Sequence, residues 1–419
     1  MKVTVVGGAS TYTPELVDGL ARLRDLLPVD ELVLADPARE RLDVVAAMSR
    51  RMLARADHPA RVVATTDIDA GVTDADAVLL QLRVGGQAAR MQDEAWPLEC
   101  GCIGQETTGA GGLAKALRTV PVVLEIAETV RKRAAQDAWI VDFTNPVGIV
   151  TRALLQAGHR SVGLCNVAIG FQRYFAGLLD VHPDAVSLGH VGLNHLTWER
   201  SVTVDGQDVL ERLIDEHAGE IAAHVDQPEW LIRQLGAVPS YYLHYFYNHD
   251  AAVAAAQGAQ SRGARVAEIE QTLLEMYADP TVDTKPTLLG ERGGAYYSEA
   301  AINLLASLTA DRGDVQVVNL RNDGTLPFLP DDAVIEVPAT ITAGGAAALP
   351  VAPVEPLYAG LIAHTFGYEQ LALDAAVHGG RDRVFQALLA HPLVGQVDQA
   401  EQLTDRLLAA NREHLDWAR

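Results

Sequence analysis

Cys165 and His195 are the residues of this 419-residue chain whose types and surroundings most suggest chemistry. Cys165 and Asn166 follow the short apolar run S-V-G-L, and His195 follows Asn194 in the segment G-H-V-G-L-N-H-L-T-W, which also holds His190. A thiolate and an imidazole are common metal ligands, so the two side chains could bind one metal ion or one substrate. They could also be structural, because a free cysteine is most often a small buried hydrophobe.

The surrounding chain alternates predicted strands with predicted helices. Apolar and β-branched runs predict strands over residues 3–6, 31–35, 61–65, 77–82 and 139–143. Helical spacing of apolar residues predicts helices over residues 37–56, 113–133 and 147–157. This alternation is typical of an α/β fold with a parallel sheet covered on both faces. In such sheets, ligands bind beyond the carboxyl ends of the strands.

The residues that follow the strands are therefore the candidates for ligand binding. Arg83 and Arg90 come after the strand over residues 77–82, and Asn145 comes after the strand over residues 139–143. Cys165 and Asn166 stand in the same position after the apolar run that begins at residue 161. We expect these side chains to meet at one edge of the sheet.

The first strand ends in a glycine turn that is typical of nucleotide binding. Gly7, Gly8 and Ser10 follow it, and T-P-E then opens a helix with proline at its first position. Asp36 ends the second strand, where a carboxylate can accept hydrogen bonds from a ribose diol. The glycine spacing differs from G-x-G-x-x-G, so a simple turn is the alternative interpretation.

Residues 104–112, G-Q-E-T-T-G-A-G-G, form a polar segment that contains Glu106. We expect it to be a loop, because it holds too many glycines for a stable element. It could close over a ligand or be a long surface connection, and the sequence leaves both open.

The second half of the chain has a different pattern. Helices are predicted over residues 210–225, 230–235, 262–277, 299–308, 359–373, 381–389 and 399–414, and strands over residues 314–320 and 333–338. Between them, A-V-P-S-Y-Y-L-H-Y-F-Y concentrates the aromatic residues that are scarce elsewhere. We therefore expect two domains, an N-terminal Rossmann-like parallel-sheet domain over residues 1–165 and a C-terminal α+β domain over residues 166–419.

Composition restricts the partners and the compartment. The formal net charge of −22 argues against nucleic acid and anionic membranes, which need a basic surface. Three cysteines cannot form a disulfide framework. The short apolar start is not a signal peptide, and no apolar run is long enough to span a membrane. We expect a cytoplasmic protein.

Taken in order, the motifs resemble those of glycoside hydrolase family 4. They are V-G-G-A-S-T-Y-T-P-E-L, R-V-G-G followed by Arg90, G-Q-E-T-T-G-A-G-G, D-F-T-N-P-V-G, G-L-C-N-V, G-L-N-H-L-T-W, P-S-Y-Y-L and R-G-G-A-Y-Y-S. Cys165-Asn166-Val167 resembles the 6-phospho-β-glucosidase branch. Ala9, Ala168 and Glu291 depart from the pattern, and Glu291 puts a negative charge where the family commonly has lysine.

The resemblance implies NAD and a divalent metal, commonly Mn²⁺, although a thiolate with an imidazole would by itself favour zinc. Most glycosidases use two carboxylates, and this family is an exception. The implied reaction oxidises C3 of the sugar, removes the proton at C2 and eliminates the aglycone. Water then adds to the unsaturated ketone, and NADH re-reduces C3. The substrate would be a small phosphorylated β-glucoside.

The resemblance also implies roles for individual residues. The metal ligands would be Cys165 and His195, and the base would be Tyr242, with Tyr241 as the alternative. Glu106 would orient substrate or metal-bound water. Sugar hydroxyls would be bound by Asn145 and Asn166, phosphate by Arg90 and Arg292, and NAD by Gly7, Gly8, Ser10, Asp36 and Arg83.

Three other functions stay open at the level of the sequence. A lactate/malate-type dehydrogenase would share this architecture but would have no use for a metal-binding cysteine. A family 4 glycosidase could act on unphosphorylated glycosides. An NAD-sensing regulator would bind the cofactor without turnover. Because folds of this kind often assemble as dimers or tetramers, we expect a homodimer or homotetramer, with the C-terminal domain contributing to the interface.

Overall fold

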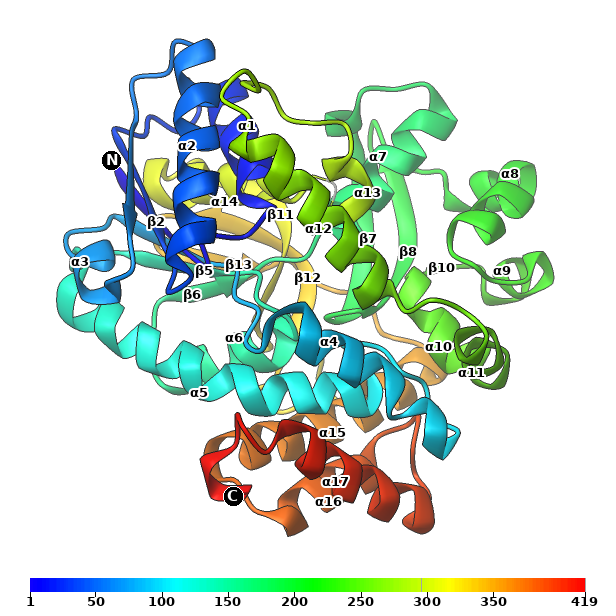
Figure 1. The fold of residues 1–419 in the computed structure, drawn as a ribbon. Helices are drawn as coiled ribbons and strands as arrows, with labels where there is room; N and C mark the ends of the chain where they lie inside the picture. The colour runs from blue at the N-terminus through cyan, green and yellow to red at the C-terminus, as the bar shows by residue number, and fades with distance from the viewer. Residues whose placement is uncertain (295, 419) are drawn as a thin grey trace.

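The computed structural model describes residues 1–294 and 296–418. Ala295, within the motif R-G-G-A-Y-Y-S, lies outside the described residues. Within the described part, thirteen strands form one sheet, and its main path runs β10-β8-β7-β12-β11-β6-β5-β4-β1-β2-β3. Helices pack around this sheet (Figure 1). None of the helices in the described ranges is both long and apolar enough to cross a bilayer.

The N-terminal part of the sheet is parallel. Its strands are β1 (Lys2–Val6), β2 (Glu31–Ala35), β3 (Arg61–Thr65), β4 (Ala77–Leu80), β5 (Trp139–Asp142) and β6 (Ser161–Gly163). They lie in the order 3-2-1-4-5-6 and pair in parallel throughout. This is the strand order of a dinucleotide-binding fold. Strands β4 and β5 are buried along their whole length, as expected for a sheet covered on both faces.

Helices connect these strands and cover the two faces. They are α1 (Thr13–Arg22), α2 (Arg39–Arg55), α3 (Ile68–Val72), α4 (Gly86–Ala95), α5 (Gly109–Arg133), α6 (Val147–Gln156) and α7 (Val167–Leu179). The C-terminal helices α15 (Pro356–His378), α16 (Arg381–Ala390) and α17 (Val397–Asn411) pack under α5 (Figure 1). Their apolar faces share one buried cluster with α5 and α6.

Antiparallel strands extend the sheet beyond β6. They are β7 (Val186–Leu193), β8 (Leu196–Val204), β9 (Gln207–Asp208), β10 (Val238–Pro239), β11 (Asp314–Arg321), β12 (Val334–Thr342) and β13 (Gly345–Ala348). The two parts join where Asn319 of β11 pairs with Gly163 of β6. A Cβ atom at Gly163 would lie 2.2 Å from Thr151 Oγ1 and 2.8 Å from Asn319 Cβ, so only glycine fits this junction.

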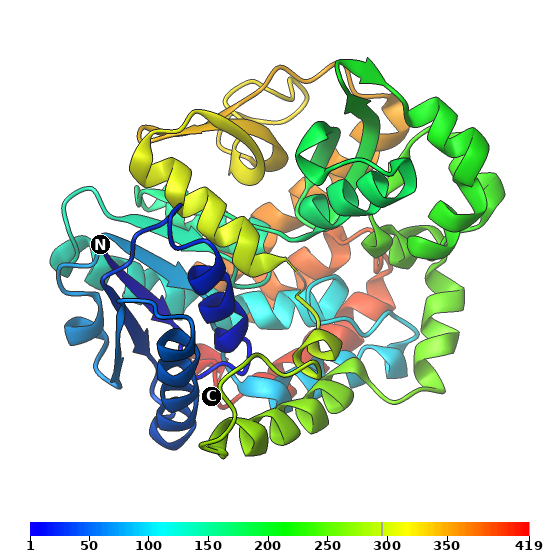
Figure 2. The ribbon, with the colours of Figure 1, turned by 90° about the horizontal axis from the view of Figure 1, so that it is seen from above.

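The remaining helices surround the antiparallel part. They are α8 (Leu210–His224), α9 (Glu229–Leu235), α10 (His244–Tyr247), α11 (His249–Gln257), α12 (Arg262–Ala278), α13 (Leu289–Arg292) and α14 (Tyr297–Ala310), with short 3₁₀ helices at Leu98–Cys100, Pro183–Ala185, Tyr241–Leu243 and Asp416–Ala418. Helix α14, yellow in Figure 2, contacts α1, β5 and β12. It therefore links the parallel and antiparallel parts.

One predicted element is wrong. The segment 104–112 was expected to be a loop, but Gly109 to Gly112 form the first turn of α5. These glycines serve close packing: a Cβ at Gly111 would lie 2.3 Å from the carbonyl oxygen of Gln105, and a Cβ at Gly112 would lie 2.7 Å from the carbonyl carbon of Thr107. These close backbone contacts require glycine at both positions. The requirement outweighs the low helix propensity of glycine.

Candidate active site

His195 is positioned by the hairpin between β7 and β8. Asn194 and His195 form its two-residue turn, and His195 has φ +65, a left-handed conformation that histidine adopts more often than most residues. Its Nδ1 atom hydrogen-bonds with Thr107 Oγ1 at 3.0 Å, and its ring stacks on Tyr242 with centroids 3.7 Å apart. Burial lowers the pKa of His195 to about 4, so the imidazole is neutral near pH 7. Neutral imidazole is the form that binds metals.

Cys165 lies just beyond β6, before helix α7, and is buried. Burial raises the pKa of its thiol well above the usual value, and the Glu336 carboxylate adds to the shift. Hydrogen bonds from the Val167 backbone and the Asn194 side chain only partly offset it. A thiolate at this position would therefore need a cation, and a bound metal would supply that charge.

Asn194 connects the two predicted metal ligands. It directly precedes His195, hydrogen-bonds to Cys165, and donates from Nδ2 to Glu336 Oε2 at 3.0 Å. Within residues 1–294 and 296–418, no group of three or more His, Cys, Asp or Glu side chains could hold a metal ion. A metal bound by Cys165 and His195 would thus complete its coordination with substrate or water, as catalytic metals do.

Tyr241 and Tyr242 lie in the 3₁₀ turn after β10, with ring centroids 4.7 Å apart. Burial raises the pKa of Tyr242 well above its usual value, and the nearby Tyr241 and Cys165 raise it further. The neutral phenol is therefore strongly favoured without a cation. A bound metal would be needed for Tyr242 to act as a base near pH 7.

Glu106 is surrounded by three cations. It forms an ion pair with Arg83, its Oε2 lies 3.0 Å from Lys115 Nζ, and its Oε1 lies 3.4 Å from Arg90. Burial alone would raise its pKa, but Arg83, Lys115 and Arg90 outweigh burial and hold the pKa of Glu106 well below its usual range. Glu106 is therefore a permanent carboxylate, suited to accept hydrogen bonds.

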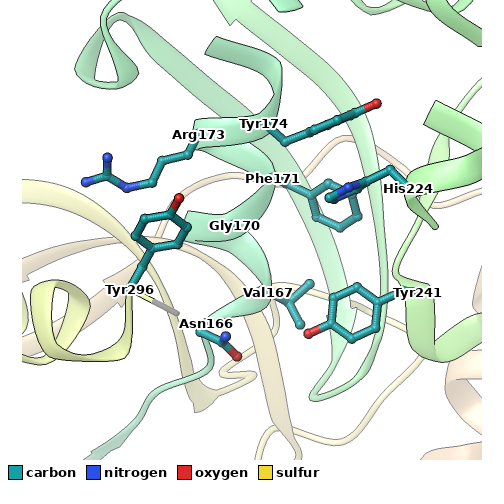
Figure 3. Close-up of a pocket in the computed structure, with 9 residues that line it drawn as sticks. All are labelled: Asn166, Val167, Gly170, Phe171, Arg173, Tyr174, His224, Tyr241 and Tyr296. Carbon is teal, nitrogen blue, oxygen red and sulfur yellow. The ribbon is translucent and has the colours of Figure 1, made fainter. Parts of the chain in front are cut away.

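The two predicted sugar-binding asparagines differ in their surroundings. Asn145 follows β5, and its Oδ1 atom is buried with no hydrogen-bond partner in the described part of the chain. Buried acceptors are rarely left unpaired, so this atom is suited to bind a ligand hydroxyl. Asn166 lines a cavity of about 340 Å³ together with Tyr241 (Figure 3).

The glycine turn after β1 packs closely against β2 and β4. Gly7 has φ +89, and a Cβ there would lie 2.6 Å from the carbonyl oxygen of Gln81. The backbone N–H groups of Gly7 and Gly8 both donate to the carbonyl oxygen of Ala35, at 2.9 and 3.1 Å. Asp36 accepts a hydrogen bond from the Ala9 N–H at 3.2 Å. This leaves a compact turn beside an acidic side chain, as nucleotide binding requires.

Arg292, the second predicted phosphate ligand, lies beside this turn. Its Nε atom donates to Thr11 Oγ1 at 2.9 Å, its NH2 lies 3.5 Å from Ser10 Oγ, and Glu270 pairs with it at 3.0 Å. Glu291, which departs from the family pattern, is exposed and pairs with Arg265. The predicted phosphate ligands thus occur in two groups, Arg90 with Glu106 and Arg292 with Glu270.

Comparison with known proteins matches the sequence of this chain to one family. Residues 2–181 match the model of family 4 glycosyl hydrolases, and residues 190–394 match the model of their C-terminal domain. The chain belongs to glycoside hydrolase family 4. The resemblance inferred from the motifs is therefore confirmed.

Relatives within family 4 cover the chain almost completely. It is 38% identical to a probable 6-phospho-beta-glucosidase of Bacillus subtilis, over 99% of this chain and 97% of that protein. It superposes with a TM-score of 0.92, at 34% identity and 99% coverage of both chains, on the 6-phospho-beta-glucosidase of Thermotoga maritima with manganese, NAD⁺ and glucose-6-phosphate. Malate dehydrogenase from Salinibacter ruber matches at 19% identity, with a TM-score of 0.55, 91% coverage of this chain and 99% of that chain. The predicted dehydrogenase-like architecture is thereby confirmed.

Residues outside the family 4 motifs also shape the site. Lys115 was missed; it stands in the run G-A-G-G-L-A-K-A-L at the start of α5, where a charged residue among small and apolar ones was the available signal. Burial lowers its pKa to about 7, and Glu106 only partly restores it. Tyr297, at the start of α14, was missed as well. Burial raises its pKa, and the charge of a Cys165 thiolate would raise it further.

A fully buried network joins the β7–β8 hairpin of this family 4 site to β11 and β12. His190 Nδ1 contacts Glu199 Oε1 at 2.6 Å, and His190 Nε2 contacts Glu336 Oε1 at 3.0 Å. Asn319 donates to Glu336 Oε2 at 2.8 Å. Although burial opposes it, the two carboxylates raise the pKa of His190 to about 10. The network fixes Glu336, which in turn holds Asn194 between the predicted metal ligands.

Proposed function

We propose that this chain is an NAD- and Mn²⁺-dependent 6-phospho-β-glucosidase that hydrolyses the β-glycosidic bond of small phosphorylated glucosides. The observation that carries the proposal is the meeting of three distant segments. The His195 ring stacks on Tyr242 with centroids 3.7 Å apart, and Asn194, which directly precedes His195, hydrogen-bonds to Cys165. The names of the relatives support the same activity.

The glycine turn with Asp36 suits NAD, and a cysteine with a neutral histidine suits a divalent metal. Cys165 and His195 would hold Mn²⁺, and Gly7, Gly8, Ser10, Asp36 and Arg83 would hold NAD. When bound, NAD⁺ would supply a hydride acceptor for C3 of the sugar, and Mn²⁺ a Lewis acid at its hydroxyl oxygens.

Tyr242 would remove the proton from C2 of the sugar, which the C3 ketone makes acidic. Elimination of the aglycone, addition of water and re-reduction would complete hydrolysis. Glu106, held ionised by three cations, would accept hydrogen bonds from substrate or from water. Asn145 and Asn166 would bind sugar hydroxyls.

Arg90 and Arg292 would bind the 6-phosphate. Arginine grips phosphate bidentately, and a phosphate monoester carries about −1.5 to −2 charge near pH 7. Both guanidinium groups already contact carboxylates, Arg90 with Glu94 and Arg292 with Glu270. The phosphate would have to compete with these contacts. This supports one alternative, a family 4 glycosidase that acts on unphosphorylated glycosides.

The deciding assay compares p-nitrophenyl β-glucoside 6-phosphate with its unphosphorylated counterpart, with NAD⁺ and Mn²⁺ under reducing conditions. We expect release of p-nitrophenol from the phosphorylated substrate only, with no net NADH. Hydrolysis of only the unphosphorylated sugar would refute the phosphate assignment. Net NADH production would support a dehydrogenase, and turnover without NAD⁺ would refute the redox mechanism.

We further propose that the protein is cytoplasmic and acts as a homodimer or homotetramer, with residues 1–165 binding NAD and residues 166–419 contributing substrate, metal and subunit contacts. The three free cysteines are consistent with a reducing compartment. Light scattering after size-exclusion chromatography would measure the subunit number, and a monomer at micromolar concentration would overturn the assembly proposal.

A further inference from the structure

We propose that the cavity beside Asn166 and Tyr241 receives the aglycone and favours an aromatic aglycone over a second sugar. This inference rests on the proposed glycosidase function and specifies its substrate class. The cavity volume of about 340 Å³ is in the range of small-ligand pockets.

The position of the cavity fits the leaving group. Asn166 directly follows the predicted metal ligand Cys165, and Tyr241 directly precedes the predicted base Tyr242. Figure 3 shows both side chains at one end of the cavity, with α7 along its side. A glycoside whose sugar lay against Cys165 and Tyr242 could therefore extend its aglycone into this space.

Rings make up most of the cavity wall. Tyr174 and His224 stack face to face with centroids 3.9 Å apart, and Phe171 meets His224 edge-on at 6.0 Å. Tyr241 and Tyr296 also line the cavity (Figure 3). Flat aromatic groups gain stacking and edge-to-face contacts in such surroundings, in addition to burial of apolar area.

Polar groups form the smaller part of the wall: the Asn166 amide, Arg173, the His224 imidazole and three tyrosine hydroxyls, of which Tyr174 Oη has no hydrogen-bond partner in the described part of the chain. Arg173 lines the cavity, but it pairs with Glu299 and its guanidinium lies 4.6 Å above the Tyr296 ring. Burial lowers the pKa of His224, which favours the neutral imidazole with one face covered by Tyr174. A glucosyl aglycone would bury several hydroxyls, and each one left unpaired weakens binding.

Gly170 provides a way to fill the cavity without disturbing the fold. It lies in α7 and lines the cavity, and a Cβ atom placed on it would meet nothing within 4 Å. Gly177, two turns later in the same helix, is exposed and equally open around its Cβ position. Gly170→Leu should therefore fill the cavity, and Gly177→Leu is the matched control.

The experiment measures kcat/KM for three 6-phosphates, p-nitrophenyl β-glucoside 6-phosphate, methyl β-glucoside 6-phosphate and cellobiose 6′-phosphate, with NAD⁺ and Mn²⁺. We expect the wild type to prefer the aryl substrate over the disaccharide by at least about tenfold. Gly170→Leu should lower the aryl value by roughly 10- to 100-fold and the methyl value by less than about threefold. Gly177→Leu should change neither.

Preference for the disaccharide, or equal losses for aryl and methyl substrates in Gly170→Leu, would overturn the inference. Saturation-transfer NMR with 2-naphthol separates this failure from failure of the proposed function. Binding to the wild type and Gly177→Leu, but not to Gly170→Leu, would support the aromatic cavity even if no 6-phosphate were hydrolysed. Equal binding to all three proteins, or to none, would overturn it.

Discussion

At the scale of single residues, Tyr242 is the group whose protonation state matters most. Its ring stacks on the His195 ring, and burial and the neighbouring Tyr241 and Cys165 all raise its pKa. We predict that Tyr242→Phe lowers kcat by about 10²–10⁴-fold, the usual contribution of a general base. The variant should still bind NAD⁺, measured by fluorescence titration, and should lose solvent deuterium exchange at C2 of the sugar.

Tyr241→Phe is the matched control, because Tyr241 is the neighbouring tyrosine and its ring lies 4.7 Å from that of Tyr242. It should keep the exchange reaction and lose less than about tenfold in kcat. If Tyr241→Phe abolished exchange while Tyr242→Phe retained it, the two roles would be reversed.

Glu106 supports a prediction about stability. Replacing it with glutamine removes the carboxylate from Arg83 and Lys115, while Arg90 keeps its ion pair with Glu94. Breaking a buried ion pair from one side costs about 3–5 kcal/mol, so Glu106→Gln should lower the free energy of unfolding by that order. Urea unfolding measures the loss. Glu99→Gln, at an exposed pair with Arg406, should cost less than about 1 kcal/mol, and similar losses in both variants would contradict the prediction.

At the scale of elements, the start of helix α5 depends on glycine. A Cβ at Gly111 would lie 2.3 Å from Gln105 O and 2.7 Å from Asp93 O. Gly111→Ala should therefore destabilise the protein by about 1–3 kcal/mol, the usual cost of overpacking. It should also lower activity, because the displaced segment carries Glu106. Gly367→Ala, inside α15 with nothing within 4 Å of its Cβ position, should instead stabilise by about 0.5–1 kcal/mol.

The buried contacts between β7, β8 and β12 predict a pH dependence. The pKa of His190 is about 10 in the folded protein against 6.5 when unperturbed. Because the folded value is raised, its contribution to stability is complete below pH 6.5 and is lost as pH rises toward about 10. Urea midpoints should therefore fall between pH 7 and pH 10. His190→Gln should be less stable at pH 7 and show a smaller fall, and parallel pH profiles would contradict this assignment.

Local patterns predicted the strands and most helices because apolar runs and turn residues are local. The strands over residues 31–35 and 61–65 have the predicted bounds. The start of α5 was missed because its glycines are needed for close packing against the backbone of Gln105 and Thr107. Patterns of apolar residues do not show such backbone contacts. Glu336 was missed for a similar reason. Its contact with His190 joins β12 to β7, and such long-range pairs leave no periodicity in the sequence.

The candidate site was predictable only in part. The motifs singled out Cys165, His195 and Tyr242, which the fold brings close together, but their roles remain predictions. The pairing of Arg90 and Arg292 with separate carboxylates depends on tertiary structure. A sequence motif reports which residue types are present, and it does not report which charges neutralise one another.

At the scale of the whole molecule, one sheet and one apolar cluster include both halves of the chain. The cluster joins Val5 and Leu34 of the parallel part to Ile302, Val318 and Val337 of the second half. We predict that the two halves unfold together, so that circular dichroism and limited proteolysis during heating give coincident transitions. A first transition restricted to one half, detected by limited proteolysis during heating, would contradict this prediction.

The pairing of β6 with β11 has a geometric consequence for the whole enzyme. The two halves meet at Gly163, where even a methyl group would overlap with Thr151 and Asn319. Any larger residue would act as a wedge and tilt the halves apart. Cys165 follows Gly163 by two residues in the parallel part, and His195 lies in the antiparallel part. The distance between the thiol and the imidazole therefore depends on residue 163 having no side chain.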